Sequence, residues 1–152
     1  MLGNGEEVML AATDLLAETK VAPELSNEAH YYRAKAYLDA GKVEGVMDDL
    51  KILAKDTRNI YGAEAKYKVA QIYFDAGQTG QAEKEVLDYI EVSTPHTYWL
   101  ARSFVLLSDV YMKLGRNLDA KQYLLSLKQN YQADDDIAGM IESRLNKLNA
   151  EN

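Results

Sequence analysis

The side chains that could do chemistry in this chain are few and scattered. The 152 residues include two histidines, His30 and His96, and no cysteine, which is too little for a His-rich centre and excludes thiolate metal sites and disulfides. The acidic run Asp134-Asp135-Asp136 lacks the alternating oxygen ligands, the glycine and the distal glutamate of a calcium loop. Gly3-Asn4-Gly5 is followed by no Gly-Lys-Ser/Thr, so it is no phosphate loop. We therefore expect no enzyme, no metal site and no cofactor.

The tyrosines carry more information than the histidines. Among the eleven, Tyr37, Tyr73 and Tyr111 stand 36 and 38 residues apart, and each is followed four residues later by a glycine. A period of this length predicts stacked helical hairpins. Each glycine supplies the left-handed conformation that ends the first helix of a hairpin.

Composition limits the partners of the chain. The formal charge of −7 repels phosphate backbones, so nucleic-acid binding is not expected. The longest apolar runs fall well short of the roughly 20 residues that a membrane span requires, so no direct membrane insertion is expected. The start of the chain has neither the basic region nor the apolar core of a signal peptide. Hydrophobic residues make up 47% of the chain, which is enough for a continuous core.

The pattern predicts a single domain over residues 1–152 that contains only helices. We expect it to hold an unpaired half-repeat helix, three hairpins and a closing helix, at residues 6–22, 26–58, 59–93, 94–131 and 134–149. The unpaired first helix indicates a piece of a longer protein. Pro23 is expected between two helices, as the stop that follows the first, and Pro95 at the first position of its helix.

The same pattern also predicts several helix caps and the apolar helix faces that are buried. Ser26 or Asn27 is expected to cap the second helix, and Thr94 the helix that begins at Pro95. Three sets of apolar residues are expected to face inward: Val8, Leu10, Ala11, Leu15 and Leu16 in the first helix; Val46, Leu50, Ile52 and Leu53 in the helix over 42–55; and Ile137, Ile141, Leu145 and Leu148 in the closing helix. His30 is expected to pack beside tyrosines.

The spacing of small, aromatic and glycine residues resembles the tetratricopeptide repeat (TPR) family over nearly the whole chain. The small residues that let the two helices of a hairpin approach are Ala34, Ala70 and Ser108, each three residues before a repeat tyrosine. Ala82 and Ala120 match the alanine that follows the glycine by five residues, whereas Val46 departs from it. The resemblance implies an all-α, right-handed α-solenoid of about three TPR hairpins, with an N-terminal half-repeat and a C-terminal closing helix.

A looser similarity concerns the setting of the protein. The longer repeats, the segment Tyr98 to Ala101 and the ending Arg144 to Leu148 resemble TPR modules of bacterial cell-envelope accessory proteins. That similarity favours a periplasmic or cell-envelope location over a cytoplasmic one.

The resemblance also places a binding groove. Tyr31 and Tyr67 lie six residues before two repeat tyrosines, on the face that lines the concave groove in TPR proteins. The residues assigned to this partner-binding groove are Tyr31, Lys35, Leu38, Tyr67, Gln71, Phe74, Arg102, Val105, Asp109 and Met112. Only Lys35 is compatible with the carboxylate clamp of chaperone-binding TPR domains, so no such clamp is expected. The alternative is that these residues only pack helix against helix.

Three functions are considered. The first is a non-catalytic scaffold that binds a peptide or helix of a protein partner in the groove. The second is a structural segment of a longer TPR solenoid that mediates self-association, as in a homodimer, or the assembly of an envelope complex. The third, an enzyme or its regulatory arm, lacks any convergent set of titratable groups.

Overall fold

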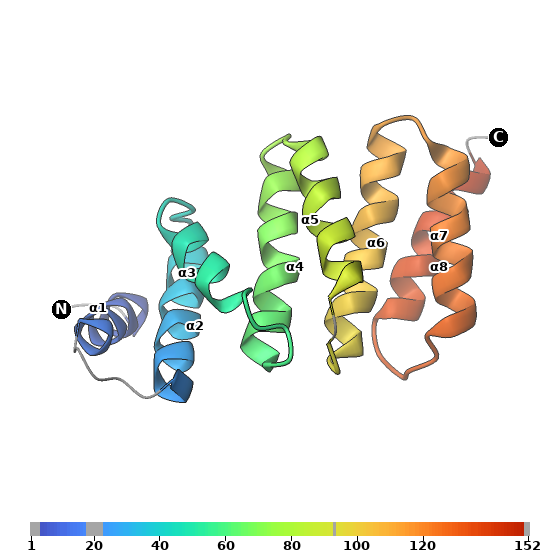
Figure 1. The fold of residues 1–152 in the computed structure, drawn as a ribbon. Coiled ribbons are helices and arrows are strands. Elements are labelled where there is room, and N and C mark those ends of the chain that lie inside the picture. Colours follow the sequence, from blue (N-terminus) through green and yellow to red (C-terminus); the bar gives the residue numbers. More distant parts are fainter. Residues whose placement is uncertain (1–3, 18–22, 93, 151–152) are drawn as a thin grey trace. The chain divides into compact units, whose positions relative to one another are not determined.

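The protein is all-helical in the part that the structure describes. The computed structural model describes residues 4–17, 23–92 and 94–150, which form eight helices and no strand (Figure 1). The helices are α1 (Asn4–Leu16), α2 (Pro23–Asp39), α3 (Val46–Leu53), α4 (Ile60–Asp75), α5 (Thr79–Glu91), α6 (Thr97–Lys113), α7 (Asn117–Asn130) and α8 (Ile137–Ala150). The predicted all-α class is therefore confirmed.

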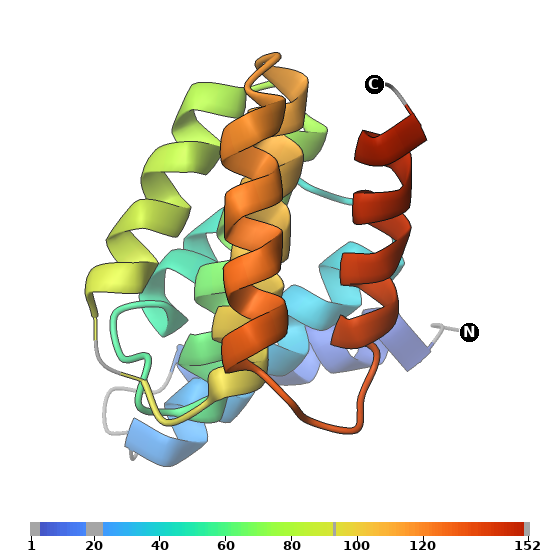
Figure 2. The same cartoon turned by 90° about the vertical axis from the view of Figure 1, so that its right-hand side faces the viewer.

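The chain divides into two compact units. Unit 1 comprises residues 1–69 and unit 2 residues 70–152, so the boundary falls inside α4. In unit 1, α2 packs against α1 on one side and α3 on the other. In unit 2, α6 packs against α5 and α7, and α8 packs against α6 and α7 (Figure 2). Each unit is described by itself below.

Three glycines end helices in the same way. Gly41, Gly77 and Gly115 have φ values of 71°, 80° and 77°, in the left-handed region that a residue with a Cβ avoids. In each turn the N–H of the residue after the glycine bonds a repeat tyrosine carbonyl, at 2.8 Å to Tyr37, 2.9 Å to Tyr73 and 2.8 Å to Tyr111. This is the Schellman motif, so the predicted role of these glycines is confirmed.

Two predicted helix starts are wrong. Pro23 is the first residue of α2 rather than a residue between helices, so Ser26 and Asn27 lie inside the helix and cap nothing. Proline is well placed at a first helical position because its missing N–H would be unpaired there. The helix α6 begins at Thr97, two residues after Pro95. Thr94 instead stabilises the preceding turn, where its Oγ1 accepts the N–H of His96 at 3.1 Å.

Two predicted apolar faces are also wrong in part. In α1 the buried residues are Met9 and Ala12, whereas Val8 and Leu10 are 37% and 52% exposed. The reason is that, within the described part of unit 1, α1 packs only against α2, which covers one strip of its surface. In α3, which is shorter than the predicted helix over 42–55, Ile52 is exposed while Val46, Leu50 and Leu53 are buried.

The core of unit 2 centres on α6. Its buried residues include an uninterrupted segment from Val105 to Ser108, because α6 is covered by three neighbouring helices. Ser108 is fully buried, and its hydroxyl donates to the Val105 carbonyl at 2.6 Å within the same helix. The closing helix α8 buries the four residues that were predicted to face inward: Ile137, Ile141, Leu145 and Leu148. This prediction is confirmed.

Unit 1 contains a buried ionic cluster. The Asp49 carboxylate on α3 is 1% exposed and accepts Nε of Arg33 at 2.7 Å and a terminal nitrogen of Arg33 at 2.5 Å. His30 Nδ1 lies 2.8 Å from the same carboxylate, and the other terminal nitrogen of Arg33 reaches Thr13 Oγ1 at 3.3 Å. The Asp49 carboxylate thereby joins α3 to α2, and Arg33 extends the connection to α1. His30 is thus held by an acid, which the sequence reading did not predict.

Candidate functional site

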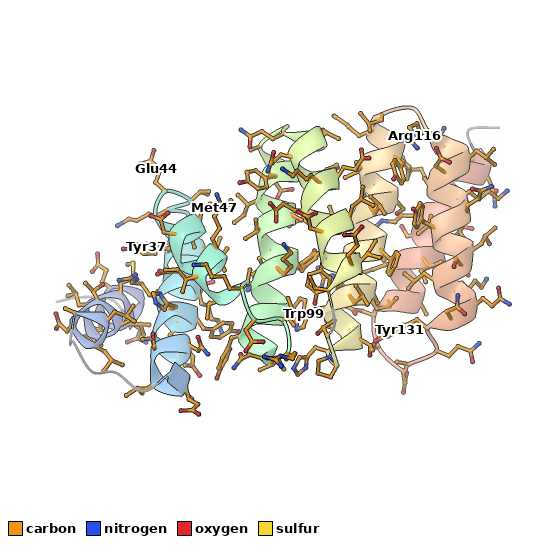
Figure 3. The ribbon with its side chains drawn as sticks, in the orientation of Figure 1. Tyr37, Glu44, Met47, Trp99, Arg116 and Tyr131 are labelled. Carbon is orange, nitrogen blue, oxygen red and sulfur yellow. The ribbon has the colours of Figure 1, made fainter. Side chains whose placement is uncertain are left out.

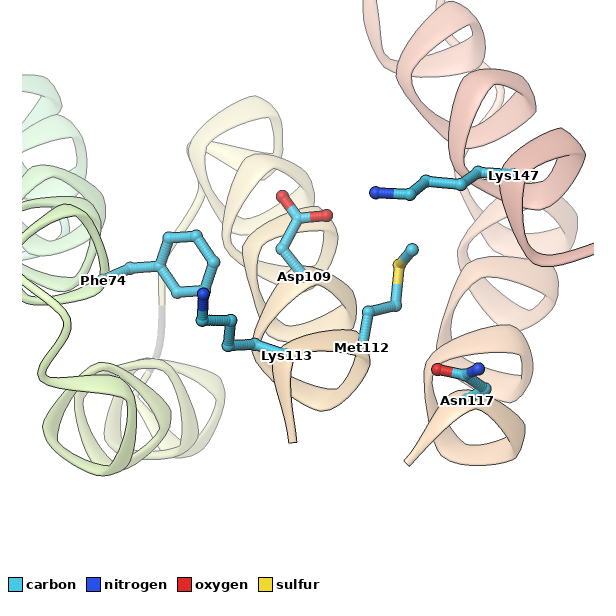
Figure 4. A pocket seen from close by; sticks show the side chains of 6 residues that line it. All are labelled: Phe74, Asp109, Met112, Lys113, Asn117 and Lys147. Atoms are coloured by element: carbon cyan, nitrogen blue, oxygen red, sulfur yellow. The ribbon is translucent and has the colours of Figure 1, made fainter. Parts of the chain in front are cut away.

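A hollow in unit 2 brings together three of the predicted groove residues with three that were not predicted. It has a volume of about 300 Å³. Its lining residues are Phe74, Asp109, Met112, Lys113, Asn117 and Lys147 (Figure 4). We call it the lysine hollow, after the two lysines at its edge.

Helix geometry explains why these residues meet. Asp109, Met112 and Lys113 follow the i, i+3, i+4 spacing and therefore share one face at the end of α6. The turn at Gly115 then reverses the chain, which places Asn117, the first residue of α7, beside that face. Lys147 extends from α8 toward Asp109 and Met112 (Figure 4). The site therefore depends on the closing helix as well as on a hairpin.

The lysine hollow contains more positive charge than negative charge. Arg144 grips Asp109 with two nitrogens, Nε at 2.7 Å and a terminal nitrogen at 2.9 Å, in the bidentate geometry that guanidinium and carboxylate favour. Asp109 is thereby neutralised. Lys113 and Lys147 are exposed and form no ion pair with the described residues. The hollow is therefore cationic, although the chain as a whole carries −7.

The apolar part of the hollow comes from Phe74 and Met112, both half-buried. A phenyl ring and a flexible thioether can pack against many apolar side chains. The ammonium groups of Lys113 and Lys147 can pair with carboxylates, and the Asn117 amide can both donate and accept hydrogen bonds. This arrangement suits the binding of an acidic segment that also carries an apolar side chain.

The remaining groove residues of unit 2 have other partners. Gln71 donates to Asp75 on its own helix at 2.8 Å. Arg102 donates to the Tyr98 hydroxyl at 3.1 Å and lies over the Trp99 ring, 5.9 Å from its centre. Figure 3 shows Trp99 near the start of α6. Val105 is only 3% exposed, so its side chain supports the core of the unit and does not face solvent.

The groove residues of unit 1 form a separate group. The Tyr31 ring packs on Tyr61 with centroids 4.5 Å apart, and burial together with the nearby Glu64 carboxylate raises the pKa of Tyr31 to about 12. Tyr67 is buried at 7% exposure. Lys35 is exposed and Leu38 is half-buried. Of the groove residues predicted in unit 1, Tyr31 therefore packs in a cluster with Tyr32 and Tyr61, Tyr67 belongs to the core, and Lys35 lies on the surface.

Lys113, Asn117 and Lys147 were not predicted from the sequence as site residues. Lys113 follows Asp109 by four residues, so their common helical face could have been recognised. Lys147 gives no such signal, because nothing in the chain indicates where α8 lies against α6. In the sequence, Arg144 and Lys147 stand out only as part of the ending Arg144 to Leu148.

The other candidate groups serve the fold. In the run 134–136, Asp135 accepts the Ile137 N–H at 2.9 Å and the Tyr131 hydroxyl at 2.5 Å, and Asp136 accepts the Tyr98 hydroxyl at 2.9 Å. Burial, followed by the bond to Asp135, raises the pKa of Tyr131 to about 12. Within the described ranges, no three His, Cys, Asp or Glu residues come together as a metal site would need.

Comparisons with known proteins assign no family to the chain. No protein-family model matches it, and no curated protein or solved structure is similar to it at a significant level. In the part of the chain that the structure describes, none of the helices has the length and apolar character that crossing a bilayer requires.

Proposed function

We propose that this chain is a non-catalytic protein-binding scaffold of TPR-like hairpins, and that its lysine hollow receives an acidic segment of a partner. The observation that carries the proposal is the hollow itself. It joins two unpaired ammonium groups to the apolar side chains of Phe74 and Met112. Surfaces that bind proteins combine an apolar anchor with charges that select the partner.

The repeat features support a TPR-like architecture. Three glycine turns bond three repeat tyrosines in the same way, and the small residues Ala34 and Ser108 are buried. A TPR-like scaffold binds its ligand by presenting side chains from successive helices. In unit 2 the lysine hollow has this construction, because its lining comes from α4, α6, α7 and α8.

The ligand class follows from the chemistry of the lining. Lysine is a strongly hydrated cation on a flexible stem, so two lysines can follow carboxylates at more than one spacing. Arg144 keeps the Asp109 carboxylate occupied, which lowers its repulsion of an incoming acid. We therefore assign to the hollow an acidic peptide segment with one or two apolar side chains.

The test uses two fluorescein-labelled peptides in anisotropy titrations. One alternates aspartate and glutamate around a leucine and a phenylalanine, and the other replaces each acid by its amide. The variant Lys113→Gln/Lys147→Gln removes both cations of the hollow. The matched control Lys84→Gln/Lys121→Gln removes two lysines from α5 and α7 outside the hollow and leaves the same net charge.

The intact protein is expected to bind the acidic peptide about tenfold more tightly than the amide peptide, as electrostatic selection of this kind allows. The hollow variant should lose that preference and the control should keep it. Equal losses in the two variants would mean that net charge alone attracts the peptide. Equal binding of the two peptides to the intact protein would also contradict the proposal.

A further inference from the structure

Unit 1 carries a second hollow with the opposite character. It has a volume of about 290 Å³ and lies between α1 and α2. Its lining residues are Val8, Ala11, Ala12, Leu15, Leu25, Glu28, Ala29 and Tyr32. Among these lining residues Glu28 alone carries a charge at neutral pH, and we call this surface the apolar groove.

The apolar groove exposes large side chains to solvent. Val8, Leu25 and Tyr32 are 37%, 44% and 47% exposed. Single exposed apolar residues are common on protein surfaces, but several gathered in one depression mark a binding surface. The apolar face that was predicted for the first helix thus exists, but in the described structure much of it stays uncovered.

The spacing of the lining residues indicates which secondary structure could fill the apolar groove. The α1 residues follow the order 8, 11, 12, 15 and the α2 residues the order 25, 28, 29, 32, which is the i, i+3, i+4, i+7 stripe of a helix in both cases. Two such stripes side by side form ridges and a groove that accept a third helix.

Charge at the rim indicates the chemistry of that helix. Glu7 and Asp14 each precede a groove residue of α1, Glu24 precedes Leu25 of α2, and Glu28 lines the groove itself. The described helix α1 contains no lysine or arginine. On α2, Arg33 is held by Asp49 and Thr13, and Lys35 follows beyond Tyr32. The groove is therefore bordered mainly by carboxylates.

We infer that the apolar groove docks an amphipathic helix of another protein, with an apolar stripe flanked by lysine or arginine. The apolar stripe would pack on Val8, Leu25 and Tyr32, and the basic flanks would meet the acidic rim. A second copy of this chain fits less well, because two acidic rims would face each other. This inference is independent of the function proposed for the lysine hollow.

Three designed peptides test the inference by fluorescence anisotropy with the full chain. The first is an amphipathic helix with leucine at i, i+3, i+4 and i+7 and lysine on both flanks. The second carries glutamate in place of lysine, and the third has the composition of the first in an order without an apolar stripe. Circular dichroism of each variant checks that the protein stays folded.

The chain offers a matched pair of substitutions. Leu25→Ser alters the groove, and Leu10→Ser makes the same change at a leucine that is 52% exposed on α1 but does not line the groove. The lysine-flanked peptide should bind at least about tenfold more tightly than the other two, and Leu25→Ser should weaken it by about tenfold whereas Leu10→Ser should not.

Replacing acidic residues of the rim by lysine tests whether the rim itself, and not general electrostatic attraction to the protein, selects the peptide. Glu24→Lys/Glu28→Lys should reverse the preference, so that the glutamate-flanked peptide binds better than the lysine-flanked one. Binding that ignores peptide order, or that falls equally in both serine variants, would overturn the inference. So would a concentration-dependent dimer, seen by light scattering, that Leu25→Ser abolishes, because the groove would then be covered by a second copy.

Discussion

The two units hold the same kind of ion pair in different surroundings. In unit 1 Arg33 grips Asp49, whose side chain is 1% exposed, and in unit 2 Arg144 grips Asp109, whose side chain is 25% exposed. Both pairs are bidentate and both join separate helices. Because the geometry is the same, we expect burial to set how much each pair stabilises the fold. When a buried charge loses its partner, no water can take the place of that partner.

The difference extends to the surfaces of the units. Unit 1 pairs Arg33 with the buried Asp49 carboxylate and leaves an apolar groove with an acidic rim. Unit 2 has a core of apolar residues along α6 and leaves two lysines unpaired at its hollow. One chain therefore offers surfaces of opposite charge, although its net charge is strongly negative.

The largest expected effect comes from the buried carboxylate. Asp49→Asn removes the charge that Arg33 and His30 share, and should lower the free energy of unfolding by about 3–5 kcal/mol. Chemical denaturation followed by circular dichroism measures it. The neighbouring Asp48→Asn is the control, because Asp48 is exposed. If the two variants lost similar amounts of unfolding free energy, the burial of Asp49 would not be the cause of its contribution to stability.

A pair of glycines extends the comparison to packing. A Cβ at Gly62 in unit 1 would overlap the carbonyl oxygens of Asp56 and Leu53, whereas a Cβ at Gly80 in unit 2 would meet nothing within 4 Å. Gly62→Ala should therefore cost about 2–3 kcal/mol, as overpacking does. Gly80→Ala should be neutral or should stabilise α5 by up to about 1 kcal/mol, because alanine favours a helix over glycine.

Thermal or chemical unfolding of both glycine variants measures whether each substitution lowers or raises the free energy of unfolding. The two positions are comparable because each lies in the first turn of its helix. A stable Gly62→Ala protein would contradict this prediction, because it would mean that the backbone at Asp56 and Leu53 shifts easily to make room for the methyl group.

The smallest expected effect concerns the half-exposed pair of unit 2. Arg144→Gln should lower the free energy of unfolding by about 1 kcal/mol, since solvent partly replaces the lost partner of Asp109. The control is Lys128→Gln, which breaks a pair whose side chains are more than half exposed and should change stability by less than about 0.5 kcal/mol. A loss at Arg144 as large as that at Asp49 would contradict the comparison.

Features that repeat along the chain were predictable from the sequence. The glycine turns after Tyr37, Tyr73 and Tyr111 follow from a local rule, since only glycine adopts the left-handed conformation without cost. The inward face of α8 was also predictable, because its apolar residues fall on one helical stripe that a folded unit must bury.

Features that depend on contacts between distant segments were not predictable. Asp49 reads as a surface acid among its neighbours, and only the approach of α2 supplies Arg33 and His30. The lysine hollow needs the placement of α8 on α6, which no local pattern encodes. The sequence predicts an apolar stripe on α1. Which part of that stripe is buried depends on which helices pack against it.

The most direct test of two surfaces with opposite preference is amide chemical-shift mapping of the ¹⁵N-labelled protein. The acidic peptide should shift amides around Met112, Asn117 and Lys147, and the lysine-flanked helix should shift amides around Val8, Leu25 and Tyr32. Each peptide should leave the other set unmoved. If both peptides shift the same amides, or neither shifts its assigned set, the two surfaces do not select partners by charge.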